Sequence, residues 1–199
     1  HAIGDRANRE TLDIFQRTFE ANPDKTDVRW RDEHTQHLHP DDIPRFGELG
    51  VIASMQGVHC TSDAPYVVAR LGEERAEAGA YVWKTLMETG AVVSNGTDAP
   101  VEDVSPIANY YATVSRKLAD GSVFYPDQRL SRLEALQTYT INAAFAAFEE
   151  DLKGSLSVGK LADITVLSKD IMTIAEDELS STEVVYTIVG GRVMYSRND

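Results

Sequence analysis

The sequence has little cysteine, few basic residues and no long apolar run. Cys60 is the single cysteine among 199 residues, so no disulfide can close within the chain, which fits a cytoplasmic protein. No stretch of about 18 apolar residues occurs, so we expect neither a membrane-spanning helix nor a membrane partner. Lys and Arg number 19 against 32 Asp and Glu, and the net charge of −13 argues against a nucleic-acid partner.

Through the first 150 residues, the apolar pattern predicts strands that alternate with helices. The predicted strands are short and cover residues 28–31, 51–55 and 92–96. Helical periodicity is expected over residues 5–20, 39–49, 73–88, 106–118 and 131–147. The joints from helix to strand are short and carry glycine, as in βα units around a parallel sheet. The pattern therefore predicts an α/β fold for residues 1–150.

From residue 151 the pattern changes to strands joined by glycine turns. Residues 164–167 form one predicted strand, and residues 184–195 form a predicted hairpin around Gly190-Gly191. The two parts are distinguished by this change of pattern, since the sequence has no low-complexity linker between them. We therefore predict two domains, residues 1–150 and a β segment over residues 151–199.

Three polar residues lie at similar places relative to the predicted strands. His34 follows the first strand, and Asp98 follows the third strand 64 residues later. His1 lies 33 residues before His34. A (β/α)8 barrel of about 250 residues uses roughly 31 residues for each unit, so these spacings are close to two units and to one. The spacing predicts that all three side chains project at one rim of a barrel, where barrel enzymes place their active sites.

Two imidazoles and a carboxylate suit a borderline divalent cation such as zinc. Such a metal lowers the pKa of a bound water and polarises a substrate carbonyl, and a nearby carboxylate can pass the water's proton to a leaving amine. Each residue also has an ordinary interpretation, because an Asp before Ala-Pro, such as Asp98, is usually a turn or helix cap. His37 and His39 are predicted to be surface residues. His59 either reaches the mouth of the pocket or belongs to a plain loop.

Short motifs along the whole chain match one family in order. They are His1-Ala-Ile-Gly-Asp-Arg-Ala7, Asp32-Glu-His-Thr-Gln36, His39-Pro-Asp-Asp-Ile-Pro-Arg-Phe46, Asn95-Gly-Thr-Asp-Ala-Pro100, Tyr139-Thr-Ile-Asn-Ala-Ala144, Lys153-Gly-Ser-Leu-Ser-Val-Gly-Lys-Leu-Ala-Asp163 and Val189-Gly-Gly-Arg-Val193. Together they resemble the amidohydrolase superfamily and, more narrowly, its branch amidohydrolase family 3. The resemblance implies an α/β fold in which residues 1–150 are the C-terminal portion of a (β/α)8 TIM-barrel metal-dependent hydrolase. It implies that residues 151–199 are part of a small β-sandwich domain.

The same resemblance implies roles for individual residues. The family's metal ligands after strands 5, 6 and 8 match His1, His34 and Asp98, which would hold one or two divalent ions, and Asp98 is also the expected general base. His59 resembles a position after strand 7 that lines the substrate pocket. The family usually has an apolar residue before Glu-His, whereas this chain has Asp32, which makes the strand end more polar.

One family feature is missing from the sequence. The family's first strand supplies a His-x-His pair that this chain lacks, and three strands cannot close an eight-stranded barrel. The chain therefore resembles the C-terminal half of a longer enzyme.

For the function, we expect hydrolysis of a non-peptide C–N bond, of the amide or N-acyl type, in a small-molecule substrate. An ester or lactone is the alternative within the same chemistry. A hypothesis of another class is an inactive fragment that serves only folding or association, including association with a second copy as a homo-oligomer.

Overall fold

The structure, a computed structural model, describes residues 1–197 and has a parallel three-stranded sheet at its centre. The strands are β1 (Arg31–Glu33), β2 (Ile52–Met55) and β3 (Val93–Asn95), hydrogen-bonded in that order. Ala2 forms a parallel bridge with His34, so the start of the chain runs beside the end of β1. Backbone bonds continue past the strand ends, from His34 N to Ser54 O and from Gly96 N to Met55 O. The carboxyl ends of the strands therefore meet along one edge.

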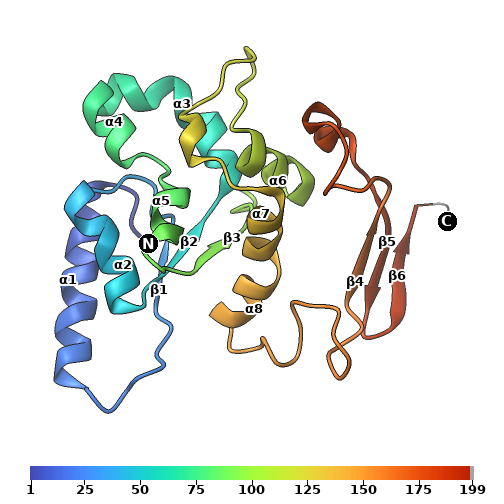
Figure 1. The fold of residues 1–199 in the computed structure, drawn as a ribbon, viewed down its shortest axis with the longest axis horizontal. Helices are drawn as coiled ribbons and strands as arrows, with labels where there is room; N and C mark the ends of the chain where they lie inside the picture. The colour runs from blue at the N-terminus through green and yellow to red at the C-terminus, as the bar shows by residue number, and fades with distance from the viewer. Residues whose placement is uncertain (198–199) are drawn as a thin grey trace.

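Helices connect these strands and surround the sheet (Figure 1). Those on the amino-terminal side of β3 are α1 (Asp5–Ala21), the 3-10 helix η1 (Pro40–Asp42), α2 (Ile43–Leu49), α3 (Gly57–Leu71), α4 (Glu73–Gly79) and α5 (Trp83–Glu88). Those that follow β3 are α6 (Pro106–Ser115), the 3-10 helix η2 (Pro126–Gln128), α7 (Arg132–Tyr139) and α8 (Ile141–Ala146). Each crossover between neighbouring strands contains helices, as a parallel connection requires.

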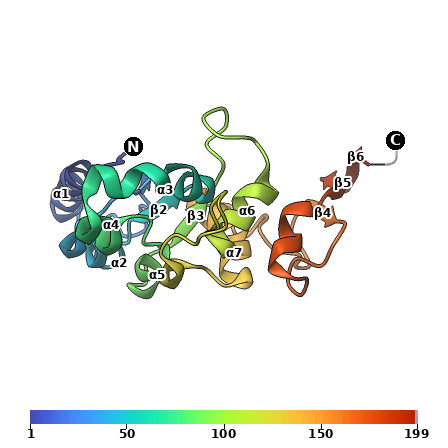
Figure 2. The same ribbon diagram turned by 90° about the horizontal axis from the view of Figure 1, so that it is seen from above.

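A second sheet is antiparallel and contains the last strands of the chain. It consists of β4 (Ile164–Leu167), β5 (Val184–Val189) and β6 (Arg192–Ser196), and the 3-10 helix η3 (Glu176–Ser181) precedes β5. Figures 1 and 2 place this sheet at the end of the molecule away from α1. Gly190 and Gly191 turn the β5–β6 hairpin with φ angles of 55° and 77°, which glycine adopts without strain. The hairpin predicted from the sequence is therefore confirmed.

The two faces of the parallel sheet differ in character. The register aligns Ala53 with Val93, and both belong to the buried apolar core. The neighbouring row aligns Glu33, Ser54 and Ser94. Because successive residues of a strand point to opposite faces, the first row faces the apolar core and the second forms a polar face.

The helices differ from the prediction in three places. α3 was not expected from the sequence, and its N-cap residue, Gln56, makes no side-chain capping hydrogen bond. The helix predicted over residues 73–88 is interrupted at Tyr81, whose φ is 54° and whose hydroxyl donates to Asp63 on α3. The helix predicted over residues 131–147 breaks at Thr140. None of the helices within residues 1–197 combines the length and apolar character that crossing a membrane requires.

Asp32 is a carboxylate inside the apolar row of the parallel sheet. It aligns with Ala53, its exposed fraction is 0%, and neither of its carboxylate oxygens has a hydrogen-bond partner within the described residues. Burial raises the pKa of Asp32 from its usual 3.8 to about 7, and the charge of Glu33 adds to the increase. The folded state therefore holds the Asp32 proton more tightly than the unfolded state does.

We predict that Asp32 makes the fold less stable as the pH rises. Because the folded pKa is raised, the free energy of unfolding decreases between about pH 4 and pH 7 as the buried carboxyl loses its proton. Replacing Asp32 by Asn removes this dependence. Between pH 4 and pH 8 the wild type should therefore lose up to about 4 kcal/mol more of its free energy of unfolding than Asp32→Asn does. Urea unfolding at both pH values measures it. Parallel pH profiles for the two proteins would contradict the assignment.

Candidate metal centre

Three side chains of types that can bind a metal follow successive strands of the parallel sheet. His34 comes directly after β1, His59 lies in the first turn of α3 after β2, and Asp98 lies three residues after β3. His34 and Asp98 have φ angles of 84° and 58°, a region that residues other than glycine seldom adopt. Such backbone conformations often accompany functional sites, and here they occur where the chain turns away from the strand ends.

The ligand atoms of these three side chains are close enough to share one cation. One such atom from each of His34, His59 and Asp98 lies within 4.8 Å of the others. Nε2 of His59 is 3.2 Å from Oδ2 of Asp98, and the rings of His34 and His59 are 6.1 Å apart between centroids. His59 is buried, whereas His34 and Asp98 are partly exposed. Two of the three side chains are therefore in contact with solvent.

His1 joins this group through His34. Nδ1 of His1 lies 3.1 Å from Nε2 of His34. The other ring nitrogen of His34, Nδ1, lies 3.0 Å from Oε1 of Gln56, whose amide nitrogen donates to the backbone oxygen of Ser54. Since Gln56 thus presents its oxygen to His34, the Nδ1–H of His34 is the donor. This leaves Nε2 of His34 facing His1.

A set of buried polar side chains holds the first turn of α3 against β3. Oδ1 of Asn95 accepts from the backbone N–H of Gly57, and Oδ1 of Asn109 accepts from the N–H of Val58. Asn109 also donates to the backbone oxygen of Gly96, and Asn95 donates to Thr113. Two backbone donors at the start of the helix are thereby satisfied by side chains from β3 and α6. The position of His59 relative to Asp98 follows from this clamp.

A second carboxylate contacts His59 on its other side. Oε1 of Glu102 lies 3.1 Å from Nδ1 of His59 and accepts a hydrogen bond of 2.6 Å from the Ser62 hydroxyl. The sequence analysis did not identify Glu102 or Gln56. Glu102 could have been noticed because it lies four residues after Asp98 in the same loop between β3 and α6. Gln56 could have been noticed because it comes directly after β2.

The remaining histidines lie outside the group. His39 is exposed, as expected, and its ring accepts from the backbone N–H of Asp41 at the start of η1. His37 is half-buried, and its ring packs edge-on against Tyr81 at 5.3 Å between centroids. The surface position predicted for His37 holds only in part, because the segment after β1 pairs with Ala80, directly after the end of α4.

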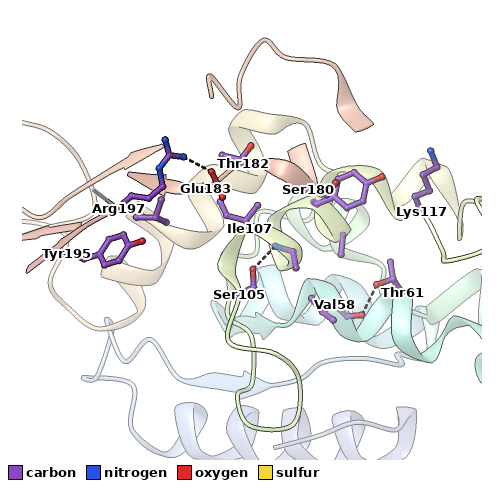
Figure 3. A pocket seen from close by; sticks show the side chains of 14 residues that line it. Val58, Thr61, Ser105, Ile107, Lys117, Ser180, Thr182, Glu183, Tyr195 and Arg197 are labelled. Atoms are coloured by element: carbon purple, nitrogen blue, oxygen red, sulfur yellow. Dashed lines mark hydrogen bonds and ion pairs between the residues drawn. The ribbon is translucent and has the colours of Figure 1, made fainter. Parts of the chain in front are cut away.

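A separate pocket of about 560 Å³ lies between α3, α6 and the antiparallel sheet. Val58 and Thr61 line it from α3, and Glu183 and Arg197 form an ion pair at its rim (Figure 3). None of His34, His59 and Asp98 is among its lining residues. This hollow is therefore distinct from the histidine and aspartate group.

The chemistry of the group is that of a site for a divalent cation. Imidazole nitrogens together with a carboxylate oxygen form a donor set that zinc prefers. Within the described residues, His34, His59 and Asp98 form the group with ligand atoms close enough to share a cation. His1, predicted as a ligand from the sequence, is not part of that group, although its Nδ1 contacts Nε2 of His34. The sequence spacing placed His34 and Asp98 in one site, and the structure brings these two together with His59.

Comparison with known proteins gives the family. The model of the amidohydrolase family, in the branch amidohydrolase family 3, matches residues 1–195. The chain belongs to amidohydrolase family 3. It is 41% identical to Protein LONG AFTER FAR-RED 3 of Arabidopsis thaliana over 98% of this chain and 33% of that protein. It is 32% identical to putative amidohydrolase YtcJ of Bacillus subtilis (strain 168), over 100% of this chain and 37% of the relative.

Another relative of this amidohydrolase segment is N-substituted formamide deformylase of Arthrobacter pascens, 28% identical over 99% of the chain and 36% of the relative. The chain thus spans about a third of the length of the curated relatives that it matches, a smaller share than the half expected from the sequence.

Solved structures of metal-dependent hydrolases share this fold. An uncharacterized metal-dependent hydrolase from Pyrococcus horikoshii OT3 matches with a TM-score of 0.76 and 32% identity, over 89% of this chain and 35% of that one. An uncharacterized metal-dependent hydrolase from Pyrococcus furiosus matches with a TM-score of 0.73 and 34% identity, over 87% of this chain and 33% of that one. Atrazine chlorohydrolase TrzN from Arthrobacter aurescens TC1, complexed with zinc, matches at 17% identity with a TM-score of 0.58, over 83% of this chain and 36% of that one, and shares the fold alone.

We predict that a methyl group at Gly57 disturbs this amidohydrolase site. A Cβ there would overlap Thr113 Oγ1 and lie 2.7 Å from the backbone oxygen of Asn109, so the first turn of α3 would have to move. Gly57→Ala should lower the free energy of unfolding by roughly 1–3 kcal/mol, as overpacking does. Gly96→Ala is the matched control, because a Cβ at Gly96 meets no atom within 4 Å. Equal effects of both changes in urea unfolding would refute the clamp.

Proposed function

We propose that this chain is part of an enzyme that hydrolyses a C–N bond of the amide or N-acyl type with water activated by a divalent metal. The observation that carries the proposal is the approach of His34, His59 and Asp98 to within 4.8 Å at the carboxyl ends of parallel strands. Family membership adds support, and so does the relative named for deformylation of an N-substituted formamide, whose name indicates a C–N substrate.

For the architecture, we propose that residues 1–150 are part of a (β/α)8 barrel and residues 151–199 are part of a small β-sandwich. The bridge at Ala2 and the order β1–β2–β3 give four neighbouring strand positions, which favours barrel positions 5 to 8. The separate antiparallel sheet of β4–β6 favours the second part.

For the metal, we propose zinc, held by His34 and Asp98 with His1 as the third family ligand. His59 would bind substrate beside them, and its place within the same group leaves it in reach of the metal as well. A divalent cation bound there supplies a Lewis acid for a carbonyl oxygen and lowers the pKa of a water. The donors fit this role because the group combines imidazole nitrogens with a carboxylate.

In the proposed reaction, Asp98 is the general base. An Oδ of Asp98 removes a proton from the attacking water, whose oxygen adds to the carbonyl carbon of the substrate. The carbon–nitrogen bond then breaks, and Asp98 gives the same proton to the leaving nitrogen. His59, buried at 3.2 Å from Asp98, holds this carboxylate in place and lines the space for the substrate. An ester or lactone would react by the same steps with an oxygen leaving group.

The second candidate function is association without catalysis by the chain alone. β6 is an edge strand of the antiparallel sheet, and it exposes Val193, Met194 and Tyr195 by 59%, 67% and 48%. An exposed apolar edge strand is a surface that pairs readily with other chains, a second copy included. Light scattering of the chain, with Met194→Lys as a variant that weakens the edge, separates this candidate from catalysis.

We predict that loss of His34 weakens metal binding and that loss of the Asp98 carboxylate slows turnover. In the full-length protein, His34→Ala should lower the bound zinc per protomer, and Asp98→Asn should reduce kcat by roughly 10²–10⁴-fold, the range for a missing general base. Metal analysis and a panel of N-acyl amino acids, N-substituted formamides, esters and lactones measure these effects.

The matched control is His39→Ala, which removes an exposed imidazole outside the group and should leave metal content and turnover unchanged. A full-length protein that binds no divalent metal after reconstitution would refute the proposed metal site. Brisk turnover by residues 1–199 alone would show instead that the segment is a complete catalyst.

A further inference from the structure

His59 lies between two carboxylates from one loop. Its Nε2 is 3.2 Å from Oδ2 of Asp98, and its Nδ1 is 3.1 Å from Oε1 of Glu102. Asp98 and Glu102 both belong to the connection between β3 and α6, which stands out from the body of the molecule (Figure 2). The imidazole itself is 8% exposed, so its position is determined by the protein and not by solvent.

Glu102 is held in this position by α3. The Ser62 hydroxyl donates to Oε1 of Glu102 at 2.6 Å, so the same oxygen receives Ser62 and faces His59. Ser62 follows His59 by one turn of α3. The side chain of Glu102 is 21% exposed, and this partial burial makes its hydrogen bonds stronger than those of a fully solvated carboxylate.

The contact with Glu102 gives Nδ1 of His59 an acceptor for a proton. An ionised carboxylate only accepts hydrogen bonds, so Nδ1 of His59 donates to Glu102 when the side of Nε2 is left to a cation shared with Asp98. In a neutral imidazole this leaves a lone pair on Nε2, which faces Oδ2 of Asp98. Two acceptor atoms 3.2 Å apart repel each other unless a proton or a metal ion lies close to both. Glu102 thereby makes the side of the imidazole near Asp98 a place that attracts a cation.

His34 has the same arrangement with a neutral partner. Its Nδ1 donates to Oε1 of Gln56, and its Nε2 is turned toward the shared space beside His1. Both imidazoles of the group are therefore fixed at Nδ1 by an oxygen of the chain and present Nε2. Histidines with this support by a second residue are those that bind metals well in proteins.

We propose that Glu102 is a positioning residue, which holds His59 as the Nδ1–H form so that Nε2 stays directed at Asp98 and at the proposed metal. The effect of Glu102 on metal binding rests on the proposed function. The position of the proton on His59 can be tested without it. Without Glu102, a neutral imidazole is stabilised when its proton moves to Nε2, because Nε2–H can then donate a hydrogen bond to Asp98. That rearrangement blocks the side that faces the metal position.

The first test is the proton position on His59. Long-range ¹⁵N–¹H spectra of the metal-free protein should show Nδ1 of His59 protonated in the wild type and in Asp103→Asn. Glu102→Ala should shift His59 toward the Nε2–H form. Asp103 is an exposed carboxylate next to Glu102 that caps Ser105, so Asp103→Asn removes a charge nearby without a change at His59. Wild-type His59 in the Nε2–H form, or a spectrum unchanged in Glu102→Ala, would overturn the proposal.

The second test is the affinity for zinc in the full-length protein. Glu102→Ala should weaken the binding of Zn²⁺ by about 10- to 100-fold, the usual effect of losing a residue that supports a metal-site histidine, and Ser62→Ala should have a smaller effect in the same direction. Thermal unfolding of each variant shows whether the fold is intact, and Glu102→Leu, which has similar bulk but no acceptor, serves if Glu102→Ala unfolds. Unchanged affinity in both Glu102 variants would overturn the proposal. A wild type that binds no zinc while His59 remains in the Nδ1–H form refutes the proposed function and leaves the role of Glu102 in place.

Discussion

The parallel register of β1, β2 and β3 is the constraint on which the site depends. The register pairs Glu33 with Ser54 and Ser54 with Ser94, and the backbone bond from His34 N to Ser54 O continues it beyond β1. Because parallel strands run in the same direction, the residues that follow them are delivered to one edge. A shift of the register by one residue would turn every side chain of a strand to the other face and separate the ligating groups.

The strand ends alone do not bring the imidazoles and carboxylates together. Asn95 and Asn109 satisfy the first N–H groups of α3 and thereby attach the helix that carries His59 to β3 and α6. Both amides are largely or fully buried, where an unpaired polar atom is costly, so the network holds one geometry. The site is therefore rigid on the α3 side, whereas Asp98 and Glu102 are carried by a loop.

The two carboxylates beside His59 give the site a negative charge. Asp98 and Glu102 are both placed beside His59, in a chain with a net charge of −13. Two carboxylates placed beside one imidazole attract a positive charge, which the proposed cation beside Nε2 of His59 would supply. The buried Asp32 differs, because it has no partner within residues 1–197 and its raised pKa lets it remain neutral.

Much of the fold follows from the sequence. The periodicity of residues 5–20 predicted α1 to within one residue of its end, and the apolar runs predicted β2, β3 and β4 closely. The spacing also placed His34 and Asp98 at one edge. Such patterns record which side of an element is buried, which is a local property of the chain.

The contacts of the site came only from the tertiary structure. α3 has no capping signal of its own, since its first turn is capped by Asn95 and Asn109, which lie 38 and 51 residues away from the amides they bind. The contact of Glu102 with His59 likewise joins residues 43 apart. Periodicity carries no information on such pairs, because they depend on the angle of a helix and on the left-handed backbone at His34 and Asp98. The sequence by itself determined the strands, their order and the residue types at their ends, and the tertiary structure decided which atoms of those residues meet.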